Sequence, residues 1–277
     1  MKDKKLKILI ITAHPDDEAI CGATIYKLVK DFGAVADLAI MTNGEGGYQY
    51  AILAEKMYGL QLTDEAIGRA YLPTIRKKEL LSAAQIIGLR NCFFLEQTDN
   101  NYSHNVADVL EGLWDIDFCL SQLNKILNKE NYDLLITMLP FGETHAHHKA
   151  VAILSLKAVQ SLPAERRPTI LGAHSGLRGE HKSFIEYVQM PHYPITKVNQ
   201  RAGILTFDKH QTFGHQNRLN YNIIISWLIA EHKSQGTMQM LMNKGRHEYF
   251  WFFELNEIHR LEAVKLLFEA LHTAPNS

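Results

Sequence analysis

One histidine and two aspartates with the chemistry of a metal site follow the first apolar run of the chain. The stretch Ala-His-Pro-Asp-Asp-Glu contains His14, Asp16 and Asp17. Residues 6–12 before it predict a β-strand, and residues 19–32 after it have the apolar spacing of a helix. These side chains would lie where a strand ends beside the core. Taken alone, adjacent acids here also fit the cap of the next helix, since carboxylates accept its free amide N–H groups.

A second group of histidines follows another predicted strand. Residues 132–140 form a buried strand pattern, and His145, His147 and His148 come in the loop after it, where a new helix opens. Taken alone, this group fits a solvated loop as well as a ligand set. Because the carboxyl ends of parallel strands meet at one edge of a sheet, the two polar groups are expected to border one crevice.

Together, the two groups predict a catalytic zinc site. His14, Asp17 and one histidine of the second group give two imidazoles and a carboxylate, which suit Zn²⁺ and leave a fourth position for water. Asp16 would lie beside that water without being a ligand. A carboxylate there can act as a general base, while the metal lowers the pKa of the water and polarises a carbonyl oxygen.

The order of predicted elements indicates an α/β fold, a Rossmann-like and mostly parallel sheet flanked by helices, with a C-terminal cap region. The chain begins strand, helix, strand over 6–12, 19–32 and 35–41, which predicts a parallel βαβ unit. The glycines at 44 and 46 do not form a dinucleotide fingerprint. Further strands are predicted at 92–95, 132–140, 168–173, 203–207 and 249–253, and further helices near 50–62, 73–88, 105–129, 219–231, 233–243 and 257–271.

Length and composition describe an ordinary globular protein. With 277 residues, the chain is interpreted as one domain over 1–277, with a core of about 1–175 and an extension of about 176–277 that completes the sheet and the substrate pocket. A net charge of −1 gives no support to a nucleic-acid partner. No apolar run approaches the ~20 residues of a membrane span. Three scattered cysteines fit a reducing compartment, so we expect a cytoplasmic protein.

The two motifs resemble those of a known family. The first motif after the opening strand, together with His145-x-x-His148 at a helix start, is similar to the PIG-L/LmbE-type zinc-dependent N-deacetylases, which remove acetyl groups from N-acetylated amino sugars. The resemblance covers roughly the first 155 residues well. Supporting matches are Gly22-Ala23-Thr24, Thr42-Asn43-Gly44-Glu45, Arg76-x-x-Glu79 and Ser234-Gln235.

The resemblance implies a role for each matching residue. It makes His14, Asp17 and His148 the ligands of one Zn²⁺ per chain. Asp16 becomes the base that activates water, and a protonated His145 stabilises the oxyanion and donates a proton to the leaving amine. Zinc-bound water would attack the acetamide carbonyl of an N-acetylglucosamine-type conjugate, a small-molecule partner. Arg76 and Glu45 are implied to bind substrate; on general grounds, Arg76 fits an exposed residue in the first turn of its helix equally well.

One position departs from the family pattern. The family commonly has His-Pro-Asp-His where this chain has His145-Ala146-His147-His148, so His147 replaces an acid that would orient the catalytic histidine. An alternative alignment of the motif, in which His147 is a metal ligand, is therefore open. Two other functions remain open as well, hydrolysis of another acylamide or ester, and a sugar-binding homologue without turnover. The sequence is also compatible with a homo-oligomer. Substrate specificity is expected to come from residues 48–75, 95–105 and 175–200.

Overall fold

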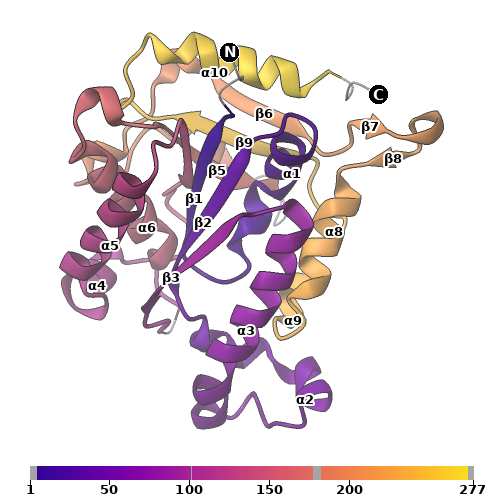
Figure 1. The fold of residues 1–277 in the computed structure, drawn as a ribbon. Coiled ribbons are helices and arrows are strands. Elements are labelled where there is room, and N and C mark those ends of the chain that lie inside the picture. The colour runs from indigo at the N-terminus through magenta and orange to yellow at the C-terminus, as the bar shows by residue number, and fades with distance from the viewer. Residues whose placement is uncertain (1–4, 101, 177–181, 274–277) are drawn as a thin grey trace.

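A seven-stranded sheet forms the centre of the protein (Figure 1). The structure is a computed structural model and describes residues 5–100, 102–176 and 182–273. In spatial order the strands are β3 (Asn91–Gln97), β2 (Val35–Thr42), β1 (Lys7–Thr12), β4 (Leu134–Met138), β5 (Thr169–Ser175), β9 (His247–Phe252) and β6 (Ile204–Asp208). Each of them overlaps a strand predicted from the sequence.

The first five strands of this order run parallel, as the predicted βαβ unit requires. β1 pairs with β2 on one side and with β4 on the other, both in parallel register. β9 is antiparallel to both β5 and β6, so the C-terminal third of the chain extends the same sheet. The α/β class with a largely parallel sheet is confirmed. The interior of β1 is fully buried because the sheet has neighbours on both edges of this strand and helices on both faces.

Helices cover both faces of the sheet (Figure 1). The helices are α1 (Gly22–Lys30), α2 (Ile52–Tyr58), α3 (Glu65–Ile87), α4 (Val106–Asp108), α5 (Ile116–Lys129), α6 (Ala146–Gln160), α7 (Lys182–Ile185), α8 (Asn222–Glu231), α9 (Gly236–Gln239) and α10 (Arg260–Leu271). One apolar cluster packs α5 and α6 on the first face. A second cluster packs α1, α3, α8 and α10 on the other. A small hairpin of β7 (Thr212–Phe213) and β8 (Leu219–Asn220) lies outside the sheet.

Three helix predictions differ from the structure. Helix α3 begins at Glu65 instead of Pro73, because the Asp64 side chain accepts a hydrogen bond from the Ile67 N–H and caps an earlier start. Pro73 lies inside the helix, where a missing N–H costs about 3 kcal/mol. Packing of α3 against α1 and α8 offsets that cost. The helix predicted for 105–129 is interrupted before α5, and the one for 233–243 shortens to α9.

The carboxyl ends of β1 and β4 lie side by side because the two strands are hydrogen-bonded neighbours. The loops that leave these ends carry the two polar groups predicted to border one crevice. Among the described residues, no helix combines the length and the apolar character that a bilayer crossing needs.

Candidate active site

Three ligand atoms from the two polar groups approach one another at the sheet edge. His14 Nδ1 lies 3.2 Å from His148 Nε2 and 3.3 Å from Asp17 Oδ2. His148 Nε2 lies 3.3 Å from Asp17 Oδ1. Atoms that bind a tetrahedral zinc at about 2.0–2.1 Å are themselves spaced about 3.3 Å apart. The spacing of His14, Asp17 and His148 therefore fits Zn²⁺.

Local hydrogen bonds fix the orientation of these ligands. After β1 the chain turns sharply, and the backbone N–H of His14 donates to Asp17 Oδ2 over 2.7 Å. His148 lies in the first turn of α6, and its Nδ1 is 2.9 Å from the hydroxyl of Thr144. Because Thr144 engages Nδ1, Nε2 is the nitrogen left to face Asp17 and His14. An outer partner of this kind is what orients a metal-binding imidazole.

The charges at the site favour a cation. Burial alone would lower the pKa of His14, but Asp99 and Asp17 on either side of the ring raise it to about 10. Burial works to raise the pKa of Asp17, yet the neighbouring His148 and His14 hold it well below its usual range. In the absence of a metal, a proton on His14 balances the carboxylates. A divalent cation that binds here would displace that proton.

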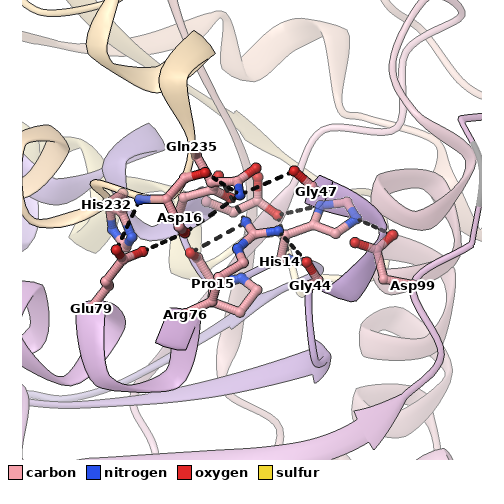
Figure 2. A network of polar contacts seen from close by, with 12 residues as sticks. His14, Pro15, Asp16, Gly44, Gly47, Arg76, Glu79, Asp99, His232 and Gln235 are labelled. Carbon is pink, nitrogen blue, oxygen red and sulfur yellow. Dashed lines mark hydrogen bonds and ion pairs between the residues drawn. The ribbon is translucent and has the colours of Figure 1, made fainter. Parts of the chain in front are cut away.

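Asp16 lies at the wall of the same cavity but is held by a different partner. Arg76 Nη2 is 2.9 Å from Asp16 Oδ2, and only 3% of the Arg76 side chain is exposed. Arg76 also donates to the carbonyl oxygens of Gly44 and Pro15, as Figure 2 shows. Arg76 therefore lies in the middle of α3 and is buried, unlike an exposed first-turn residue. Its guanidinium fixes the direction of the Asp16 carboxylate.

His145 has a defined tautomer. The backbone N–H of His147 donates to His145 Nδ1 over 3.0 Å, so a neutral ring carries its proton on Nε2. Burial and the charges of His14, His147 and His148 lower the pKa of His145 to about 2. In the absence of a metal, this lowered pKa favours the neutral imidazole, and the protonated His145 implied by the family resemblance stays a prediction.

His147 lies on the opposite side of His14 from the predicted ligand set. Its Nδ1 is 3.0 Å from His14 Nε2 and 3.4 Å from Asp99 Oδ1, and the residue is 1% exposed. Its ring packs on Trp114 with the ring centres 5.1 Å apart. His14, His145 and His147 also offer atoms close enough to share a metal. The alternative in which His147 is a metal ligand, which the sequence left open, is therefore compatible with the structure. His148, however, lies beside Asp17 together with His14, which is the ligand set that the family resemblance implies.

Two cavities meet at these residues. One of about 430 Å³ is lined by polar groups that include Gln49, Asp99, Asn100 and Gln235. The other, of about 240 Å³, has a mixed lining, with apolar side chains such as Met138 of β4 and Ala173 of β5 beside polar ones such as Thr144 and Ser175. The walls of both include the reactive groups of the site, namely Asp16, Asp17, His145 and His148.

The sequence matches a known family over most of the residues that build this site. The family model described as "PIG-L: GlcNAc-PI de-N-acetylase" matches residues 9–159. The chain belongs to the PIG-L family. Of the residues assigned above, His14, Asp16, Asp17, Arg76, His145 and His148 all lie inside the matched segment.

Two further comparisons place this PIG-L family member among known proteins. It is 27% identical over 163 residues to a probable N-acetyl-alpha-D-glucosaminyl L-malate deacetylase 2 of Bacillus cereus. That match covers 59% of this chain and 65% of the relative. A second relative with the same printed name, from Bacillus anthracis, is 25% identical over 169 residues, with 61% of this chain and 66% of the relative covered. The chain thus spans slightly less than two thirds of these relatives.

Solved structures share the fold over nearly the whole chain. The A40926 pseudoaglycone deacetylase Dbv21 superposes with a TM-score of 0.53 at 17% identity, with 92% of this chain and 99% of that chain covered. The 4-carboxy-2-hydroxymuconate hydratase GalB from Pseudomonas putida KT2440 gives 0.55 at 13% identity, with 89% and 95% covered. A deacetylase and a hydratase thus share this fold, so the fold by itself does not select the reaction.

A buried ion pair supports the turn that carries the acidic residues. His232, which follows α8, lies 2.5 Å through its Nε2 from Glu18 Oε1, and both side chains are fully buried. Burial would lower the pKa of His232, but the Glu18 carboxylate raises it above its ordinary value. Nearby, Glu79 of α3 accepts hydrogen bonds from the N–H and the hydroxyl of Ser234. These contacts join the C-terminal part of the chain to the PIG-L motif.

Replacing His232 by leucine is expected to destabilise the protein by about 3–5 kcal/mol, because Glu18 would remain buried without its cation. The raised pKa adds a pH dependence to the wild type. Its contribution to stability is complete below about pH 6.5, the ordinary pKa of histidine, and is lost as the pH rises through the raised pKa. Urea unfolding across this pH range measures both effects. Lys233→Ala, at a side chain 42% exposed, is the control and is expected to change stability by less than about 0.5 kcal/mol.

The sequence did not predict the contacts of two acidic residues near the site: Asp99 had no role there, and Glu45 was expected to bind substrate. Asp99 follows β3, at the same edge of the sheet, and its carboxylate faces His14 at 3.6 Å. Glu45, expected to bind substrate, accepts a hydrogen bond from the Asp99 N–H over 3.0 Å. The rule that ligands collect at the carboxyl ends of parallel strands would have found Asp99. Part of the range 175–200, expected to set specificity, lies outside the described residues.

Proposed function

We propose that this protein is a zinc-dependent hydrolase that removes the N-acetyl group from an N-acetylglucosamine-type conjugate. The observation that carries the proposal is the spacing of the ligand atoms of His14, Asp17 and His148 at 3.2–3.3 Å, beside an Asp16 carboxylate that is not part of the set. Family membership and the printed names of the Bacillus relatives support an acetylated glucosamine as the substrate. Proteins that only bind sugars do not need this unligated carboxylate.

His14, Asp17 and His148 would hold the metal. When bound, Zn²⁺ supplies a Lewis acid that lowers the pKa of water and polarises a carbonyl oxygen. The Arg76 contact engages Oδ2 of Asp16, and Oδ1 accepts the proton of the water that attacks the amide carbon. The carboxyl group then carries the proton that the leaving amine requires.

His145 acts as a hydrogen-bond donor in its neutral form. Its Nδ1 is occupied by the His147 N–H, so Nε2–H is the donor available to the developing oxyanion. This role needs no protonated imidazole and therefore agrees with the lowered pKa. In this proposal His147 has two contacts with the site. Its backbone N–H fixes the tautomer of His145, and its side chain contacts His14.

His145→Ala is expected to lower kcat by about 10²–10³-fold, the cost of one oxyanion donor, with zinc content unchanged. Acetate release from an N-acetylglucosamine conjugate and metal analysis of the same sample test this. His259→Ala is a matched control, because His259 has a side chain 71% exposed. Loss of zinc from the His145 variant would contradict the assignment, since it would make His145 a ligand.

The family fold alone does not exclude hydrolysis of a different acylamide or of an ester. A panel of N-acetylated sugars, compared with fluorogenic esters at equal zinc loading, separates these reactions. The proposal requires that the acetamides be cleaved with the higher kcat/KM. Esters that are cleaved better than every acetamide would overturn the substrate assignment.

A further inference from the structure

The second cavity of the active site extends from the reacting groups to an apolar wall. Its volume is about 240 Å³. This volume includes the space beside Asp16, Asp17, His145 and His148, where the amide would react. Its apolar wall is formed by Ala19, Ile20, Met138, Leu139, Phe141 and Ala173, and polar side chains of Thr144, His174 and Ser175 line other parts of it.

This cavity is part of the folded framework. Met138 and Ala173 are paired residues of the neighbouring strands β4 and β5, so the floor belongs to the central sheet. The small side chain of Ala173 leaves the space that a larger residue would fill. Phe141, which packs on His174 with ring centres 4.8 Å apart, adds a wall in the loop after β4. Because these residues are buried in the sheet and its loops, the cavity is pre-formed.

The reacting groups lie where the two cavities meet. An amide carbon placed beside Asp16 and His145 has its two substituents on opposite sides, the amine on one and the acyl chain on the other. The larger cavity offers Gln49, Asn100 and Gln235, which suit sugar hydroxyls. The smaller cavity offers an apolar wall. Glu143 also lines this cavity, but it is exposed and lies at the opening to solvent. The sugar therefore fits the first cavity and the acyl chain the second.

We infer that the substrates of this site include N-acyl amino sugars whose acyl chains are longer than acetyl, with the chain bound in the apolar cavity. The inference rests on the proposed function and adds the acyl specificity. The reaction remains a hydrolysis. The amide C–N bond breaks and a C–O bond forms with the oxygen of water. The fatty acid leaves as a carboxylate, and the amine receives a proton from water through Asp16.

The test is the release of free amine from N-acetyl-, N-butanoyl-, N-hexanoyl- and N-octanoylglucosamine, with zinc measured on the same sample. Burial of each added methylene raises kcat/KM by up to about fourfold. We expect the kcat/KM of the hexanoyl substrate to equal or exceed that of the acetyl substrate. A lower value would overturn the inference while cleavage of the acetyl substrate keeps the proposed function. If no N-acylglucosamine is cleaved, both fail.

Ile20→Phe tests whether the cavity is responsible, because the added ring would occupy it. The ratio of hexanoyl to acetyl kcat/KM is expected to fall at least about tenfold, the usual cost of one misplaced methylene. Ile258→Phe makes the same change at a residue 61% exposed and is expected to leave the ratio as in the wild type. If circular dichroism shows that Ile20→Phe is unfolded, Ala173→Val takes its place. An unchanged ratio in a folded cavity variant would refute the assignment of the acyl chain to this cavity.

Discussion

His14→Ala is expected to abolish both zinc binding and hydrolysis, with kcat reduced by more than about 10⁴-fold. Three protein ligands are the minimum that catalytic zinc sites use, and His14 contributes the nitrogen that lies close to both of the others. Without it, Asp17 and His148 remain 3.3 Å apart and cannot complete the site. The loss of the metal removes the Lewis acid that the whole mechanism shares.

The measurement for this variant is zinc stoichiometry together with acetate release. His215→Ala serves as the control, since His215 lies in the exposed segment around β7 and β8, far along the chain from the ligand set. It is expected to retain one zinc per chain and full activity. A His14→Ala protein that still binds one zinc with wild-type affinity would contradict the ligand set, and it would equally exclude the alternative group of His14, His145 and His147, because both groups contain His14.

Asp16→Asn is expected to lower kcat by about 10²–10⁴-fold while the zinc remains bound. Asparagine keeps an oxygen for Arg76 but cannot take a proton from water. The loss therefore falls on the chemical step, with little change in the binding of substrate. Asp64→Asn is the matched control, because Asp64 caps α3 and asparagine is an equally good cap. A rate for Asp16→Asn within a factor of ten of the wild type would exclude Asp16 as the base.

The central sheet could be predicted because its strands carry a strong local pattern. The apolar runs that became β1, β2 and β4 are short, bounded by turn residues and buried on both faces, which is typical of parallel strands. The rule for strand ends predicted that His14 and Asp17 would lie near a histidine of the second group, and the family resemblance selected His148 among the three histidines there. The separation of the two groups in sequence did not matter because β1 and β4 are neighbours.

Contacts between distant segments could not be predicted from local patterns. Glu248 of β9 accepts hydrogen bonds from Ala23 N–H and Thr24 N–H and so caps α1 from 225 and 224 residues away. An exposed helix position fitted Arg76 as well as a substrate-binding one did, because nothing near it in sequence reveals that Asp16 lies against it. The tautomer of His145 depends on one backbone N–H, which sequence alone does not place.

The start of helix α3 was predicted wrongly for a related reason. Pro73 carried a strong local signal for a helix start, but the cap at Asp64 and the packing of α3 against two other helices outweighed it. Local signals compete with tertiary packing, and the balance is decided by surfaces that meet only in the folded chain.

The most direct test of the account is acetate release from a panel of N-acetylglucosamine conjugates, with the zinc content of the same sample determined before and after chelation. We expect one zinc per chain, release of acetate in proportion to that zinc, and recovery of both when Zn²⁺ is added back. Full activity in a sample stripped of metal, or one tightly bound zinc without acetate release from any acetylated sugar, would contradict it.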